Sequence, residues 1–172
     1  MRLIGIDLAA RTTNVSSIAT YEDGRIRTYS VYSDENILEI IKNFKPDVLA
    51  IDAPLVVVEK PFRSAEREMQ QFGYKLMPLN TPDMQDLAKR ASSIGYAIEN
   101  LTKVIECHPN STKKALNVNN VKELKNVKFL NIIKNEHESD AIFAVVTALF
   151  FKEDNYNSFG DDEEGYIIVP KL

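Results

Sequence analysis

The sequence predicts an α/β domain with a mixed sheet, in which three antiparallel strands are followed by parallel strands and helices cover both faces. Two observations favour this class. The first third of the chain has alternating and apolar segments around an Asp-Gly turn, which is typical of an antiparallel hairpin. Further along, short apolar runs alternate with helical patterns, which is typical of parallel strands joined by crossover helices. We expect residues 1–172 to form a single domain, since this length suffices for one full hydrophobic core.

The three antiparallel strands are expected before residue 34. The run Arg2–Ala10 carries four large aliphatic residues and reads as a buried central strand. Asn14–Tyr21 is rich in small and β-branched residues, Glu22–Gly24 forms the turn, and Arg25–Ser33 alternates between two faces. These segments therefore predict a strand followed by a hairpin.

The first helix and the first parallel strand come next. Asp34 is the expected cap of a helix that continues through Phe44, and Pro46 ends it. Asp47–Asp52 is continuously apolar between its two acids, as in a strand covered on both faces. Because a helix precedes this strand, we expect it to lie parallel to Arg2–Ala10.

The rest of the chain predicts helices, two strands and a loop. The helices are expected at Pro61–Gly73, Thr81–Leu101, Pro109–Leu116 and Glu136–Phe151. The strands are expected at Lys103–Glu106 and Tyr166–Val169. The acidic, Gly-containing stretch Asn155–Gly165 predicts a mobile loop. The last helix should approach the sheet closely through a face of small residues at Ala141, Ala144 and Ala148.

Composition excludes several classes of protein. Hydrophobic residues make up 44% of the chain and charged residues 27%, which are globular values. No apolar run reaches the roughly 18 residues that a membrane span needs, so we expect no membrane association. The chain starts directly in a strand without the pattern of a secretory signal, so we expect a cytoplasmic protein. Cys107 is the only cysteine, which excludes an intrachain disulfide and a cysteine-rich zinc site.

The charge is unevenly distributed along the chain. The net charge of −4 argues against binding of nucleic acid through the overall electrostatic field. Residues 103–134 nevertheless sum to +5, whereas residues 135–172 sum to −7. The positive segment predicts a local basic surface, and the alternative interpretation is a solvated helical face.

Four acids occupy similar places in the predicted elements. Asp7, Asp52 and Glu106 each end an apolar strand, and Asp140 lies in the first turn expected for the last helix. Strand ends converge at the sheet edge where α/β proteins bind ligands. Carboxylates gathered there repel one another unless cations neutralise them, and oxygen ligands favour Mg²⁺ or Mn²⁺. We therefore predict a metal site at this edge.

Each acid also has a purely structural interpretation. Asp7 could accept hydrogen bonds from the turn that follows it, and Asp52 could cap the turn at Ala53-Pro54. Glu106 could pair with a lysine, and Asp140 could be a helix N-cap with Ser139. One turn before Asp140 stands His137, which is a candidate proton shuttle or outer ligand, or else a surface histidine.

A carboxylate cluster of this kind suits phosphoryl transfer. Two cations about 4 Å apart can activate a water and stabilise the leaving oxygen of a phosphodiester. Four basic residues follow the predicted strand ends and are candidate phosphate contacts: Arg63, Arg67, Lys113 and Lys114. Glu106 would be a fourth ligand or would orient the attacking water.

The order of predicted elements resembles the ribonuclease H-like fold over nearly the whole chain. Several ordered motifs also resemble those of the family called domain of unknown function 429, namely GIDLA, AIDAPL, RSAERE, ECHP, HESDAIFAVVTALF and GYIIVP. That resemblance implies a predicted nuclease. It also implies that Asp7, Asp52 and Asp140 fall on the metal-binding acids of ribonuclease H-like enzymes, with Glu106 as a plausible fourth.

The leading functional hypothesis is a divalent-metal-dependent nuclease. We expect its binding of nucleic acid to be weak, salt-dependent and better for short, branched or single-stranded ligands than for long duplex. One alternative is a catalytically silent ribonuclease H-like binding or regulatory module. The other is an actin-like phosphotransferase, but that class generally uses two such domains, and the AARTTN segment after the first strand lacks the glycines of a phosphate loop.

Overall fold

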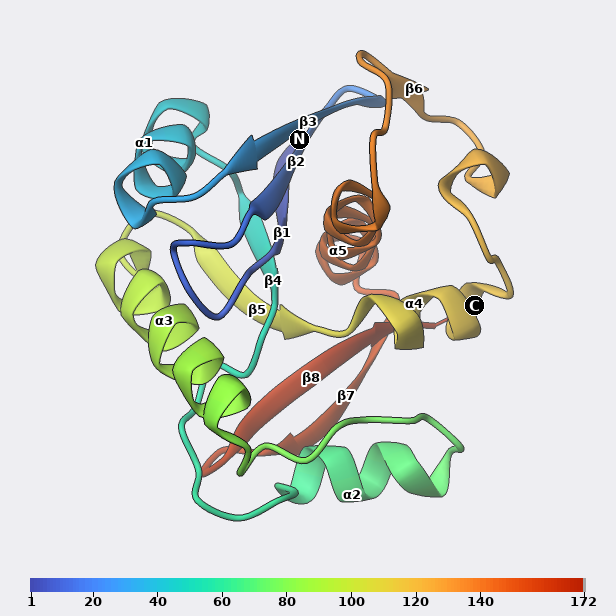
Figure 1. Cartoon of the computed structure of the whole chain (residues 1–172). Helices are drawn as coiled ribbons and strands as arrows, with labels where there is room; N and C mark the ends of the chain where they lie inside the picture. The colour runs from blue at the N-terminus through green and yellow to red at the C-terminus, as the bar shows by residue number, and fades with distance from the viewer. Residues whose placement is uncertain (172) are drawn as a thin grey trace.

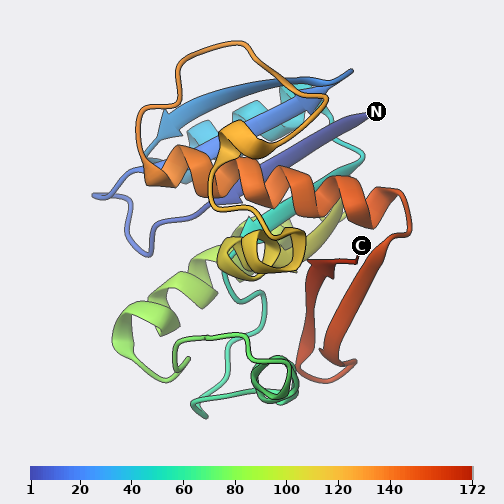
Figure 2. The ribbon, with the colours of Figure 1, turned by 90° about the vertical axis from the view of Figure 1, so that its right-hand side faces the viewer.

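The computed structural model describes residues 1–171 and shows an eight-stranded mixed sheet with helices on both faces (Figures 1 and 2). The strands are β1 Arg2–Asp7, β2 Ser16–Glu22, β3 Arg25–Val31, β4 Val48–Asp52, β5 Lys103–Cys107, β6 Lys128–Phe129, β7 Tyr156–Asp161 and β8 Gly165–Pro170. The helices are α1 Asp34–Phe44, α2 Ser64–Gln71, α3 Pro82–Ile98, α4 Pro109–Leu116 and α5 Glu136–Lys152, with a short 3₁₀ turn, η1, at Val121–Glu123.

The order of strands across the sheet is β6-β3-β2-β1-β4-β5-β8-β7. Strands β1, β2 and β3 pair in antiparallel fashion, whereas β1, β4, β5 and β8 are parallel to one another. This arrangement confirms the predicted fold class, including the parallel pairing of the first strand with the strand that ends at Asp52. None of the helices among residues 1–171 is long and apolar enough to cross a membrane.

Alternation along β1 and β4 divides the core between the two faces of the sheet. Ile4 and Ile6 of β1 pack with α1 and α3, which lie together on one side in Figure 1. Leu3 of β1 and Ala50 of β4 pack on the other side against α5. Successive side chains of a strand point to opposite faces. The residues two or four positions after Leu3 and Ala50 in their strands therefore also face α5.

Helix α5 lies unusually close to β1, and Gly5 permits this approach. A Cβ atom built on Gly5 would lie 2.2 Å from the carbonyl oxygen of Ala141 and 2.3 Å from the amide nitrogen of Val145. The helix therefore packs its backbone directly on the strand. This confirms that the small-residue face of the last helix, which includes Ala144 and Ala148, packs against the sheet.

The helix starts differ from two sequence-based expectations. Ser33, not Asp34, caps α1, since the Ser33 side chain accepts a hydrogen bond from the Asn36 amide. Asn135 caps α5 by accepting from the amide of Glu138. Because α5 begins at Glu136, Asp140 lies in its second turn rather than its first and does not cap the helix.

The expectation of a mobile loop at Asn155–Gly165 was wrong. Tyr156–Asp161 forms β7, which pairs with β8 in an antiparallel hairpin at the edge of the sheet. Phe159 is buried there with Ala65 and Met69 of α2, which packs beneath this hairpin in Figure 1. The acidic composition of the segment reflects its exposed turn, whereas cross-strand pairing and one apolar anchor determine the strand.

Candidate active site

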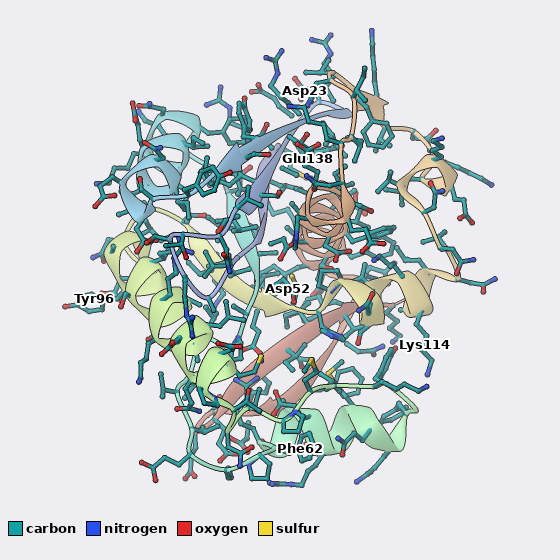
Figure 3. All side chains as sticks on the ribbon, viewed as in Figure 1. Asp23, Asp52, Phe62, Tyr96, Lys114 and Glu138 are labelled. Carbon is teal, nitrogen blue, oxygen red and sulfur yellow. The ribbon has the colours of Figure 1, made fainter. Side chains whose placement is uncertain are left out.

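Asp7 and Asp52 lie side by side at the carboxyl edge of the sheet. The parallel register of β1 and β4 pairs the two residues directly, and adjacent strands are about 4.8 Å apart. Both side chains belong to the face that α5 covers, in step with Leu3 and Ala50. Figure 3 shows Asp52 at the end of β4, near α4 and α5.

Three side chains from α4 and α5 complete the cluster. His137 Nδ1 lies 2.8 Å from Asp7 Oδ2, and His137 is itself exposed. Lys113 Nζ donates to Asp140 Oδ1 at 2.6 Å, and both side chains are about a quarter exposed. We call Asp7, Asp52, Asp140, His137 and Lys113 the carboxylate cluster. Its members come from four elements, which no local sequence pattern would bring together.

The positive charge within the carboxylate cluster does not offset the burial and mutual repulsion of its acids. Burial raises the pKa of Asp52 well above its usual range, and the negative charges of Asp7 and Asp140 raise it further. Burial also raises the pKa of Asp7, although its hydrogen bond with His137 opposes the rise. A site that disfavours ionised carboxylates in this way favours binding of an additional cation.

The donor chemistry of the cluster suits a hard divalent cation, because its acidic members offer only oxygen. Among residues 1–171, however, no group of three or more His, Cys, Asp or Glu side chains is gathered as a metal site. Asp7 is engaged by His137, and Asp140 is engaged by Lys113. The residue types therefore fit such a cation, while the carboxylate contacts in this structure are made to protein groups.

Glu106 lies on the opposite face of the sheet from Asp7 and Asp52. The register of β4 with β5 pairs Ile51 with Glu106, so Cys107 is the residue of β5 in step with Asp52. The Glu106 carboxylate accepts from Arg63 Nη1 at 3.0 Å and from the Leu55 amide at 3.0 Å. It makes a buried ion pair within the protein, which argues against its predicted role as a fourth metal ligand.

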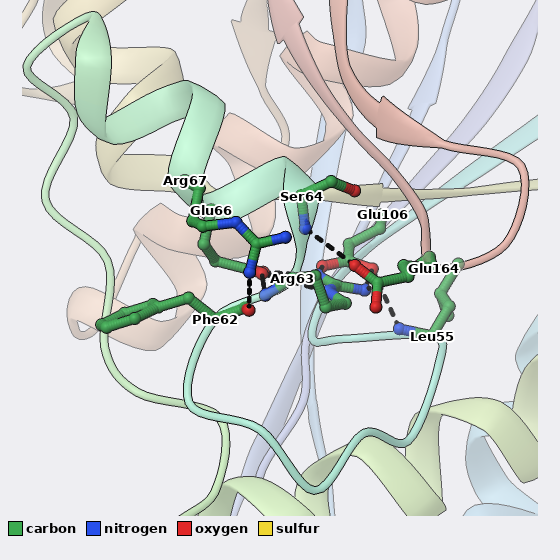
Figure 4. Close-up of polar contacts among 8 residues, drawn as sticks. All are labelled: Leu55, Phe62, Arg63, Ser64, Glu66, Arg67, Glu106 and Glu164. Carbon is green, nitrogen blue, oxygen red and sulfur yellow. Dashed lines mark hydrogen bonds and ion pairs between the residues drawn. The ribbon is translucent and has the colours of Figure 1, made fainter.

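Arg63 is fully buried and is therefore not the phosphate contact that we expected from the sequence. Its guanidinium donates to Glu66 and Glu106 and to the carbonyl of Glu164 (Figure 4). Nearby Arg67 is exposed, and its Nη1 donates to the Phe62 carbonyl at 2.8 Å. Arg67 stays a candidate phosphate contact, whereas Arg63 connects structural segments.

The two lysines of α4 have different environments. Lys113 belongs to the carboxylate cluster, and its Nζ also lies 5.2 Å from the centre of the Phe143 ring. Lys114 Nζ donates to the Gly73 carbonyl at 2.6 Å and lies 4.8 Å from the centre of the Tyr74 ring. Of the two, only Lys114 faces outward from the cluster, and its role as a phosphate contact stays a prediction.

Sequence reasoning missed His108, although it stands in the ECHP motif. His108 Nδ1 lies 2.7 Å from Ser111 Oγ, and its ring borders the cavity next to Asp7 and Asp52. A histidine directly after a buried strand and before the proline that starts a helix was the available signal. It places a ring nitrogen at the same sheet edge as the acids.

Two solved structures of RuvC resemble the chain. A RuvC from Thermus thermophilus in complex with a Holliday junction substrate is 14% identical, covers 89% of this chain and 96% of its own, and gives a TM-score of 0.57. A second Thermus thermophilus RuvC structure is 12% identical, covers 89% of this chain and 96% of its own, and gives a TM-score of 0.54. No protein-family model and no curated protein matches, so membership in domain of unknown function 429 stays a prediction. The strand order and these neighbours show that the chain has the ribonuclease H-like fold of RuvC.

Proposed function

We propose that this protein is a divalent-metal-dependent nuclease that hydrolyses phosphodiester bonds at the carboxylate cluster. One observation carries the proposal: Asp7 and Asp52 are paired in adjacent parallel strands of a ribonuclease H-like sheet, and the charge of Asp140 acts on both. The nucleic acid in complex with the similar RuvC supports the class of substrate.

Asp7, Asp52 and Asp140 would hold Mg²⁺ or Mn²⁺ through their carboxylate oxygens. A cation held there would supply an activated water and neutralise charge on the phosphate. Glu106 has no part in this assignment, since Arg63 and the Leu55 amide already satisfy its carboxylate.

His137 is the candidate proton carrier. Its Nδ1 is fixed against Asp7 while the side chain is 58% exposed, so the other ring nitrogen can exchange a proton with solvent. Lys113 holds Asp140 in place through its 2.6 Å contact and offers a positive charge near the phosphate position. Within the carboxylate cluster, Asp7, Asp52 and Asp140 thus share the metal-binding role, and His137 and Lys113 each have a role of their own.

The test combines metal binding with cleavage. Chelator-treated protein is titrated with Mn²⁺ during thermal melting, and cleavage of labelled single-stranded and four-way-junction oligonucleotides is measured in parallel. A cation that binds only the folded state stabilises it by about 2.7 kcal/mol at a hundredfold excess over its dissociation constant. We expect the stabilisation and the cleavage in the native protein, and the loss of both in Asp52→Asn. Asp83→Asn is the matched control, because Asp83 is exposed and pairs with Arg11 on the surface, away from the carboxylate cluster.

A catalytically silent binding module is the second candidate function. It is favoured by the contacts of His137 and Lys113, which engage two of the three acids within the protein itself. Absence of a melting shift with Mg²⁺ or Mn²⁺, together with absence of cleavage, would support this candidate and refute the nuclease.

A further inference from the structure

A cavity of about 220 Å³ adjoins the carboxylate cluster. Asp7 and Asp52 form part of its wall, and most of the remaining wall is apolar. The apolar wall comes from the strand ends, the loop before α3 and the first turns of α3, through Leu8, Pro54, Leu76, Met77, Leu79 and Met84. Its volume is below the roughly 300–1,000 Å³ of sites for drug-sized ligands. A cavity of this volume can hold a ligand of about the size of a nucleobase.

A second depression, of about 420 Å³, meets this cavity at His108, which lines both. Its lining residues include Lys75, Asn110 and Lys114. The Lys114 ammonium donates to the Gly73 carbonyl rather than to an acid. Figure 3 shows Lys114 on the outer side of α4. A basic depression thus leads away from the carboxylates.

We propose that the two depressions together hold an unpaired nucleotide strand, with one base in the apolar cavity and the neighbouring backbone at Lys75 and Lys114. This inference rests on the proposed function. A phosphodiester at Asp7 and Asp52 carries a base within reach of the adjoining cavity, and no ligand needs to be invoked beyond the substrate itself. A base stacked in a duplex cannot enter, so the strand must be single or locally unpaired.

Exposed apolar side chains on the loop over this region support a base contact. Met77 is 68% exposed although it lines the cavity, and Phe72 is 67% exposed just before the loop. An exposed apolar side chain at the rim of a cavity can pack against a base. Single-strand binding proteins combine such surfaces with a positively charged groove. The net charge of −4 is consistent with this mode, because few phosphates need be contacted.

Fluorescence anisotropy with Ca²⁺ in place of Mg²⁺ tests the inference. The probes are a labelled single-stranded oligodeoxynucleotide, the same strand in a blunt duplex, and a set of strands with one abasic site moved along the sequence. We expect the single strand to bind at least tenfold more tightly than the duplex. Loss of one stacked base removes about 1–3 kcal/mol, so an abasic site at one position should weaken binding about 5- to 150-fold.

Two variants address the cavity and one addresses the basic depression. Met84→Trp fills the cavity, and Met77→Asp places a charge at it; both should remove the preference for the intact strand over the abasic one. Ile132→Asp is the matched control, because Ile132 is 83% exposed and lines neither depression. Lys75→Glu with Lys114→Glu should weaken all strands, whereas Lys122→Glu on η1 should not.

The outcomes separate this inference from the proposed function. If every abasic strand binds as tightly as the intact one, or if duplex binds as well as single strand, the base-binding cavity is refuted while the nuclease proposal stands. If no oligonucleotide binds at low salt, both are refuted. Because Met77 is exposed, Met77→Asp should fold normally, so the test does not depend on Met84→Trp.

Discussion

Asp52 is the residue at which burial and like charge act in the same direction. Burial raises its pKa, and the carboxylates of Asp7 and Asp140 raise it further, while the charge of Lys113 opposes the rise. The folded chain therefore keeps a proton on Asp52 at pH values where the unfolded chain, with a pKa near 3.8, has lost it. This part of the stability is present at low pH and is lost as the pH rises through the folded pKa.

We predict that Asp52→Asn stabilises the metal-free protein at neutral pH. The amide removes the ionised group, so the free energy of unfolding should exceed that of the native protein at pH 7, and the difference should shrink toward about pH 4. Urea denaturation with a chelator, repeated across this pH range, measures the effect. A variant less stable than the native protein at pH 7 would mean that protein hydrogen bonds hold the Asp52 carboxylate. Added Mn²⁺ should reverse the order.

Among the elements, α5 and β1 form the contact that positions the cluster. The helix carries His137 and Asp140, the strand carries Asp7, and the absence of a side chain at Gly5 sets their separation. Any residue larger than glycine there must push the helix away from the strand, because the nearest atoms are backbone.

We predict that Gly5→Ala destabilises the protein by about 3 kcal/mol or more, the upper range for overpacking, as measured by urea denaturation. Gly95→Ala, in helix α3, is the control. A Cβ on Gly95 would meet only Leu55 Cδ2 at 3.9 Å, so this change in α3 should stabilise by about 0.5–1 kcal/mol. Equal effects at the two glycines would show that helix packing does not set the separation of α5 from β1.

At the scale of the whole molecule, Arg63 joins segments that are distant in sequence. Its guanidinium binds Glu66 of α2, Glu106 of β5 and the Glu164 carbonyl in the turn between β7 and β8 (Figure 4). Glu106 in turn accepts from the Leu55 amide after β4. These contacts fix Glu66 and Glu106, which themselves line the cavity beside the carboxylate cluster.

We predict that Arg63→Met lowers the free energy of unfolding by about 3–5 kcal/mol, because it leaves Glu66 and Glu106 as buried charges without a partner. Combining it with Glu66→Gln and Glu106→Gln should recover part of the loss. Arg67→Met, at an exposed position in the same helix, should change stability by less than about 1 kcal/mol. A small effect of Arg63→Met alone would contradict the role of this buried ion pair.

The sequence by itself determined the fold class and the pairing of two acids. Apolar runs ending in Asp7 and Asp52, with a helical pattern between them, predicted parallel neighbours, and the structure pairs these residues in register. The small face of the last helix likewise predicted its close packing on the sheet. These features follow from local periodicity and from the requirement that each apolar face be buried. Both can be read from a short window of sequence.

Only the tertiary structure decided which charged side chains share the site. The register of β5 differs by one residue from the one that would align Glu106 with Asp52, and a shift of one residue moves a side chain to the other face. Burial of Arg63 and the contact of Lys113 with Asp140 also depend on segments far apart in the chain. Register and long-range ion pairing result from the packing of the whole sheet with its helices. They therefore cannot be predicted from local composition.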